Sequence, residues 1–202
     1  GLAPKVALGY SSSAGDGLCG NGWSLSTGLG LISRDARPGE LCYDWRDSFT
    51  WNGQKLVKVS GAANSSDGVY RLETATDFSR FELSGSAGGG VWTVYGSDGA
   101  VTVFGQDASS RVYDPVRNER VYSWSFSRRT DLNGNYMRAV YDESSRASHN
   151  MIYLKEIRYT GNDAAGAEPR QFVRFGYRAR ATAFVSRPLS RLKRVGVLPL
   201  VR

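Results

Sequence analysis

The stretch that decides the fold of this chain is Gly17-Leu18-Cys19-Gly20-Asn21-Gly22-Trp23-Ser24-Leu25. Three glycines and one asparagine fall within residues 17–22, and such residues tolerate positive φ and close backbone approach. Residues 6–10 before this bend and residues 23–26 after it alternate between larger apolar and small side chains. The pattern predicts a strand, a wide turn and a returning strand, with the large Trp23 indole seeding a core.

Strand signals recur along the rest of the chain with turn signals between them. Asn52-Gly53 is a strong two-residue hairpin signal, and it predicts that Phe49 pairs with Leu56 and Trp51 with Gln54. A second hairpin is expected over residues 91–104, around a turn at residues 97–99.

The most regular alternation lies in residues 121–128, where Tyr122, Trp124 and Phe126 occupy one face and serines the other. This pattern predicts a half-buried strand. Such spacing of strands and turns is typical of an antiparallel all-β architecture, so we expect a twisted sheet of successive hairpins, part of a shell or a β-sandwich or open-barrel-like fragment.

Composition agrees with this fold class. The chain has 202 residues, 24 glycines and 12% aromatic residues, a balance that favours strands and turns over helices. It lacks a run of about 18 apolar residues, so we expect no membrane span. Residues 1–4 do not resemble the start of a signal peptide, and we expect residues 1–202 to be a single all-β region from a longer chain.

The positive charge is concentrated at the C-terminal end. Residues 168–202 contain nine arginines and lysines and one acidic residue, Glu168, so they carry a net charge of +8, while the other 167 residues carry −1. Nucleic-acid binding is one interpretation, but no nucleic-acid motif accompanies the charge. We therefore expect basic C-terminal strands with solvated arginines, or contacts to an acidic neighbour, and no nucleic-acid partner.

The two cysteines, Cys19 and Cys42, each lie beside a predicted turn. Two thiols cannot complete a zinc site, and the single histidine, His149, is distant in sequence. A Cys19–Cys42 disulfide could form if the chain is exported, and it would contribute about 3 kcal/mol.

No catalytic or metal-binding constellation emerges from the residue pattern. Asp131, Asn133 and Asn135 alternate as calcium ligands do, but Gly134 and the missing glutamate fit an Asn-Gly turn better. His149 stands alone in a polar segment. We therefore expect no enzyme activity, no cofactor and no metal.

The aromatic strands leave a second function class open. Their side chains could form sugar-stacking faces of a glycan-binding or adhesive module, although such faces more often belong to a core. The candidate residues are Trp92, Tyr95, Tyr122, Trp124 and Phe126.

An ordered series of short motifs also runs along the chain. It opens with Pro4-Lys5-Val6-Ala7-Leu8-Gly9-Tyr10-Ser11-Ser12-Ser13, Gly20-Asn21-Gly22-Trp23-Ser24-Leu25 and Ile32-Ser33-Arg34. It continues with Tyr43-Asp44-Trp45-Arg46-Asp47-Ser48-Phe49, Trp92-Thr93-Val94, Ser97-Asp98-Gly99, Phe104-Gly105, Ser123-Trp124, Gly134-Asn135 and Tyr153-Leu154-Lys155-Glu156-Ile157-Arg158-Tyr159. This series resembles the SpvB family, which includes the B subunits of bacterial insecticidal toxin complexes and is related to the RHS/YD-repeat proteins.

The resemblance implies a structural role. Members of the family build a hollow β-shell that holds a toxic polypeptide, so we expect this region to be an early part of an RHS-like wall. Expected partners are the remainder of the same polypeptide or a toxin-complex C subunit, together with the encapsulated toxin. The expected location is secreted or extracellular, with a cytoplasmic stage before export. The ADP-ribosyltransferase activity of one branch needs a Glu-x-Glu pair, which this sequence lacks.

Overall fold

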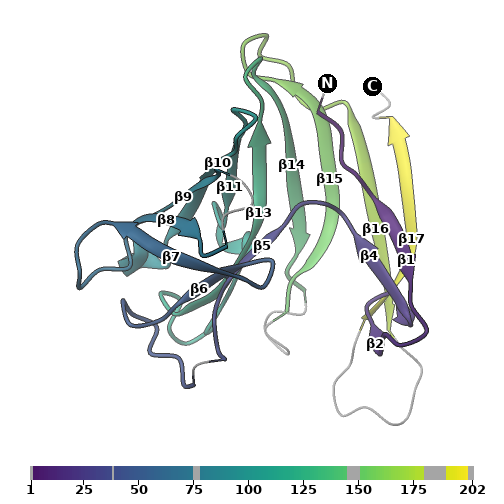
Figure 1. The fold of residues 1–202 in the computed structure, drawn as a ribbon. Helices are drawn as coiled ribbons and strands as arrows, with labels where there is room; N and C mark the ends of the chain where they lie inside the picture. Colours follow the sequence, from purple (N-terminus) through teal and green to yellow (C-terminus); the bar gives the residue numbers. More distant parts are fainter. Residues whose placement is uncertain (1, 38, 75–77, 145–150, 180–189, 200–202) are drawn as a thin grey trace.

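The computed structural model describes residues 2–37, 39–74, 78–144, 151–179 and 190–199, with the backbone alone at 16, 179 and 190–199. The described residues form β-strands and two single-turn 3₁₀ helices, η1 (Ser86–Gly88) and η2 (Ala108–Ser110), and they contain no α-helix. All strand pairings are antiparallel, so the predicted all-β class is confirmed (Figure 1).

Eight strands close into a barrel, which is drawn in blue and teal in Figure 1. Each strand pairs with the next along the chain, and β13 pairs with both β5 and β11 to complete the ring. The barrel strands are β5 (Leu31–Arg34), β6 (Phe49–Trp51), β7 (Gln54–Ser60), β8 (Gly68–Leu72), β9 (Arg80–Ser84), β10 (Val91–Tyr95), β11 (Val101–Phe104) and β13 (Val121–Thr130).

An open sheet extends from the same β13. Its further strands are β14 (Asn135–Asp142), β15 (Tyr153–Asn162), β16 (Gln171–Ala179) and β17 (Ser190–Pro199). Along one edge, β13 pairs with β5 at residues 123–125 and with β14 at residues 128–130; along its other edge it pairs with β12 (Arg111–Tyr113) and β11. The sheet therefore forks at β13, which belongs to both halves of the molecule.

A side chain closes the gap at this fork. The Tyr141 hydroxyl of β14 donates a hydrogen bond to the carbonyl oxygen of Phe126, at 2.7 Å. Burial raises the pKa of Tyr141, so the hydroxyl remains a donor at neutral pH.

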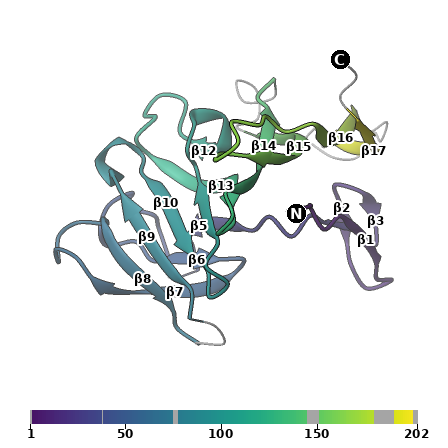
Figure 2. The same ribbon diagram turned by 90° about the horizontal axis from the view of Figure 1, so that it is seen from above.

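The N-terminal residues form a separate arm. Strands β1 (Ala7–Tyr10) and β4 (Trp23–Ser26) pair with Tyr10 opposite Trp23, and the short ladder of β2 (Asp16–Gly17) and β3 (Gly20–Asn21) lies between them. This confirms the predicted strand, turn and returning strand. Both views place the arm beside β16 and β17 and away from the barrel (Figures 1 and 2).

The expectation that Trp23 seeds the core is wrong. Its side chain is 43% exposed and contacts mainly Tyr10, whose ring centre lies 5.2 Å away. The core lies instead inside the barrel, where the largest side chains with less than 2% exposure are Trp92, Trp124, Phe49, Phe81 and Phe126. Trp92 makes edge-to-face contacts with Phe49, Tyr70 and Trp124 at 5.1, 5.0 and 6.1 Å.

The two predicted hairpins are confirmed. In the first, Phe49 pairs with Leu56 and Trp51 with Gln54, and the turn residues Asn52 and Gly53 have φ values of 49° and 82°. Two positive φ values match the right-handed twist of the flanking strands, which explains why Asn-Gly is preferred there. In the second, β10 and β11 flank the turn at residues 97–99.

The predicted half-buried character of β13 needs correction. Trp124 and Phe126 are buried as expected, but Ser123 and Ser127 on the opposite face are also buried. The segment that carries η2 lies against Ser127, whose hydroxyl donates to the Ser110 hydroxyl at 3.0 Å. Serines are small enough to lie beneath a covering loop, so polar alternation here marks close packing and not solvent.

Candidate functional site

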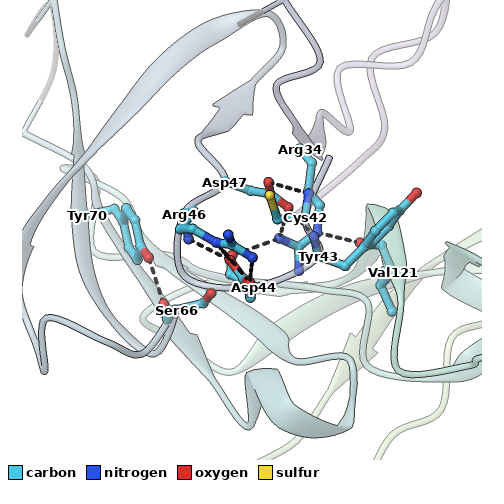
Figure 3. Close-up of polar contacts among 9 residues, drawn as sticks. All are labelled: Arg34, Cys42, Tyr43, Asp44, Arg46, Asp47, Ser66, Tyr70 and Val121. Carbon is cyan, nitrogen blue, oxygen red and sulfur yellow. Dashed lines mark hydrogen bonds and ion pairs between the residues drawn. The ribbon is translucent and has the colours of Figure 1, made fainter. Parts of the chain in front are cut away.

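A buried ion pair lies at the barrel end where β5 finishes (Figure 3). Arg34 Nη1 lies 2.8 Å from Asp47 Oδ2, and the two side chains are only 3% and 4% exposed. The Arg34 Nε donates to the carbonyl oxygen of Val121 at 2.8 Å, which ties β5 to β13. A buried guanidinium needs such acceptors because desolvation is costly.

Asp47 also fixes the segment that leads from β5 to β6. Its Oδ1 accepts a hydrogen bond from the backbone N–H of Cys42 at 2.9 Å, and its Oδ2 accepts one from Tyr43 at 2.7 Å. Tyr43 has a φ of 59°, a conformation that these contacts hold in place. The carboxylate therefore closes the loop over the barrel end.

Aromatic rings surround the same guanidinium. The Arg34 carbon Cζ lies 5.3, 5.2 and 5.7 Å from the ring centres of Tyr43, Phe49 and Trp124. Burial lowers the pKa of Arg34, and the Asp47 carboxylate opposes that shift. An arginine guanidinium is effectively always protonated in proteins, so the group stays charged at neutral pH. We call the Arg34–Asp47 ion pair and the groups bound to it the clasp, since its polar groups bind one another and hold the loop to the barrel.

The neighbouring Asp44–Arg46 pair is different. These side chains are 36% and 58% exposed, and the hydrogen bonds from Arg46 lower the pKa of Asp44 to about 2.

Nearby, the Tyr70 hydroxyl donates to the Ser66 carbonyl oxygen at 2.6 Å, and burial raises the pKa of Tyr70 to about 12 (Figure 3).

Described residues line cavities both in the barrel and beside the open sheet. One, of about 260 Å³, lies where β5 begins, and it is lined by apolar core side chains with Asp98 and Arg129 among its polar residues. The other, of about 380 Å³, separates the arm from the open sheet and is lined by Trp23 and Leu25 on one side and by Leu154 and Tyr177 on the other. Within the described ranges, no group of three His, Cys, Asp or Glu side chains is placed to hold a metal ion.

The structure divides the predicted aromatic contact residues into two groups. Trp92, Trp124 and Phe126 are core residues with 0%, 1% and 1% exposure, so the expectation that they form a contact face is wrong. Closure of the barrel places their strand faces inside it. Tyr95 and Tyr122 are 38% and 40% exposed, but they lie on different strands, β10 and β13.

The two cysteines are not brought together. Cys19 lines the cavity between the arm and the open sheet, whereas Cys42 lies in the loop at the end of the barrel. They therefore belong to different parts of the fold, and no Cys19–Cys42 disulfide is present in the structure.

Two further candidates are the Asp131–Asn135 segment and His149. Asp131 Oδ1 accepts hydrogen bonds from the backbone N–H groups of Asn133 and Asn135, both at 2.9 Å, as expected for a turn. His149 lies outside the described residues.

Sequence reasoning missed the role of Arg34 and Asp47, although both stand in motifs noted above. A usable signal was present. Arg34 is two residues after the apolar Ile32 in β5, and Asp47 is two residues before Phe49, the first residue of β6, so each charge lies on the same side of the chain as a buried apolar residue. Two inward charges of opposite sign, one at the end of a strand and one just before its partner strand, predict a buried ion pair.

Glycine at position 105, from the Phe-Gly motif, has an equally structural role. Its φ is 66°, and a Cβ atom there would lie 2.3 Å from the Trp124 ring. The motif residues therefore serve the packing of Trp124.

Comparisons with known proteins identify the family and the fold. Residues 1–188 match the family described as "SpvB: Salmonella virulence plasmid 65kDa B protein". None of the curated proteins matches the chain. Within the described residues, no helix is both long and apolar enough to cross a lipid bilayer.

Solved structures with the same fold include an effector domain and Tc toxin complexes. The N-terminal domain of effector protein SpvB from Salmonella typhimurium strain LT2 is 23% identical, with a TM-score of 0.72, over 93% of this chain and 72% of that one. The TcdB2-TccC3-Cdc42 structure gives 21% identity and a TM-score of 0.72 over 93% of this chain. A Tc holotoxin pore from Photorhabdus luminescens gives 20% identity and a TM-score of 0.68 over 92% of this chain.

This chain spans only 11% and 10% of the matched chains in the latter two structures. The family match nevertheless covers nearly the whole sequence, and the chain belongs to the SpvB family.

Proposed function

We propose that this chain is a structural, non-catalytic wall segment of a bacterial toxin-complex or RHS-like protein. It helps to form a shell that encapsulates or presents a toxic polypeptide. Its partners are then the remainder of the same polypeptide or a toxin-complex C subunit, together with the enclosed toxin, and the assembly is secreted.

One observation carries this proposal: the side chains of the family motifs are used in building the barrel. Arg34, Asp47, Phe49, Trp92 and Trp124 all meet in one closed cluster. The open sheet continues from the barrel through β13 and can extend a wall.

Family membership and the likeness to the TcdB2-TccC3 assembly support an association with toxins. A glycan-binding role is not favoured, because Trp92 and Trp124 offer no exposed face to a sugar.

The test is protease protection of the toxic polypeptide by the longer protein that carries residues 1–202. We expect the toxin to resist added protease with the unchanged protein and to become cleavable when Trp124→Ala opens the wall. Equal protection by both proteins, with the variant shown to be locally unfolded, would contradict a wall role. So would substrate turnover by the purified chain that is abolished by His149→Ala.

A further inference from the structure

Three arginines stand directly opposite one another on adjacent strands of the open sheet. Arg128 of β13 pairs in register with Arg138 of β14, and Arg138 pairs with Arg158 of β15. Opposed residues on neighbouring strands lie about 5 Å apart, and like charges in such positions repel. The row therefore carries an electrostatic cost that the fold itself does not require.

This row faces away from the core. Met137 and Ile157, the neighbours of Arg138 and Arg158 along their strands, belong to the buried cluster, so the arginines occupy the opposite face. Arg128, Arg138 and Arg158 are 32%, 41% and 36% exposed. Arg174 of β16 adds a fourth guanidinium on this face, at 57% exposure.

Carboxylates of the same chain neutralise the row only in part. Arg128 pairs with Asp163 and Arg138 with Glu168, and these acids are 53% and 74% exposed. Arg158 and Arg174 share the single buried Glu156, at 2.9 and 2.7 Å. Four guanidiniums thus face three carboxylates, and the buried Nε of Arg138 has no acceptor among the described residues.

We propose that this arginine row, formed by Arg128, Arg138, Arg158 and Arg174, docks an acidic polypeptide segment. Carboxylates of that segment would replace Asp163 and Glu168, whose exposed ion pairs are weak and exchangeable. The charge of the row itself supports this partner, because four guanidiniums stand against three carboxylates of the same chain. The inference goes beyond the wall role and does not depend on it.

The surroundings of the row favour a polypeptide over a nucleic acid. The nearby rings are not available for base stacking: Tyr136 lies beneath Arg128 and is 5% exposed, and Phe172 lies beneath Arg174 and is 6% exposed.

The experiment measures binding of a short fluorescent glutamate-rich peptide to the full chain by anisotropy at low ionic strength. We expect Arg138→Gln to weaken binding about threefold to tenfold, since it removes a charge-assisted contact at the centre of the row. Arg80→Gln is the matched control, because Arg80 is 45% exposed and forms a similar surface pair with Glu82 on the barrel. It should change affinity by less than about twofold.

A second pair of variants tests the exchange of carboxylates. Glu168→Gln frees Arg138 and should strengthen peptide binding by about twofold to threefold, whereas Glu73→Gln, which changes the net charge equally beside Lys55, should not. Arg138→Lys keeps the charge and guards against a folding defect in Arg138→Gln.

Two results would overturn the proposal. One is an equal effect of Arg138→Gln and Arg80→Gln in variants that unfold at the same temperature as the unchanged chain. The other is tighter binding of single-stranded oligothymidine than of the peptide, with the same dependence on Arg138, which would identify a nucleic-acid surface instead.

Discussion

The barrel and the N-terminal arm both place tryptophan on alternating strands, Trp92 and Trp124 in the barrel and Trp23 in the arm, but the two regions bury it to different extents. Trp92 and Trp124 in the barrel are 0% and 1% exposed, whereas Trp23 in the arm is 43% exposed. All four residues of β1 in the arm are exposed, and the arm meets the open sheet across a cavity of about 380 Å³. A two-stranded hairpin is marginally stable alone, so the arm depends on a neighbour while the barrel supplies its own core.

This difference shows which part of the molecule can be stable on its own. The barrel closes on itself through β13 and therefore has no unpaired edge around its ring. The open sheet and the arm leave β17 and β1 as terminal strands in their sheets.

The largest expected effect is on the barrel core. Trp124→Ala should lower the free energy of unfolding by about 3–5 kcal/mol, because it leaves a large cavity and removes the indole N–H bond to Gly89. Trp23→Ala in the arm should lower it by less than about 1 kcal/mol. Urea unfolding followed by fluorescence measures both, and similar losses for the two variants would remove the distinction between barrel and arm.

The next effect concerns the clasp. Asp47→Ala should cost about 3 kcal/mol, since it leaves the Arg34 guanidinium buried without its carboxylate. Asp44→Ala is the matched control on the same loop, and its exposed pair with Arg46 should contribute less than about 1 kcal/mol. Thermal unfolding of the two variants measures the loss of stability in each. An equal loss would show that the buried ion pair stabilises the fold no more than the exposed one.

A smaller effect is expected at the fork between the two sheets. Tyr141→Phe removes the donor to the Phe126 carbonyl and should cost about 1 kcal/mol. Tyr95→Phe, at a half-exposed ring, should change stability by less than about 0.5 kcal/mol. If Tyr141→Phe proved neutral in chemical denaturation, the hydroxyl would not be what closes the fork.

A further expected effect is a dependence of stability on alkaline pH. The pKa of Tyr70 is raised by burial from 10.0 to about 12 in the folded chain. Between these values the unfolded chain loses the phenol proton while the folded chain keeps it, so stability should fall as pH rises above about 10. Thermal unfolding across that range should show a shallower fall for Tyr70→Phe than for the unchanged chain, and identical slopes would contradict the shift.

Local signals predicted much of this fold. The Asn52-Gly53 turn predicts its hairpin and its register, because two positive φ values at the turn select one pairing. The strand and return around residues 17–25 follow from the same kind of local reasoning.

Closure and burial could not be predicted in this way. The pairing of β5 with β13 joins Ser33 to Ser123, and no local pattern specifies a contact over such a separation. Without that contact, Trp23 and Trp124 look equivalent in sequence, since both follow a strand alternation. The covering of Ser127 by the segment around Ser110 is likewise a tertiary effect. The inward placement of Arg34 and Asp47 could have been predicted, because each lies two residues from an apolar residue, Ile32 or Phe49, and so shares its side of the chain.

The most direct test of the central claim is amide hydrogen exchange of the isolated chain, read strand by strand. Amides of β10 and β13 in the barrel should exchange slowest, through global unfolding, and those of β1 and β4 in the arm should exchange faster by orders of magnitude. The proposed wall role predicts that the same arm amides become protected when the chain is joined to the remainder of a shell polypeptide. Equal, slow exchange of arm and barrel in the isolated chain would contradict the account, because the arm would then need no neighbour.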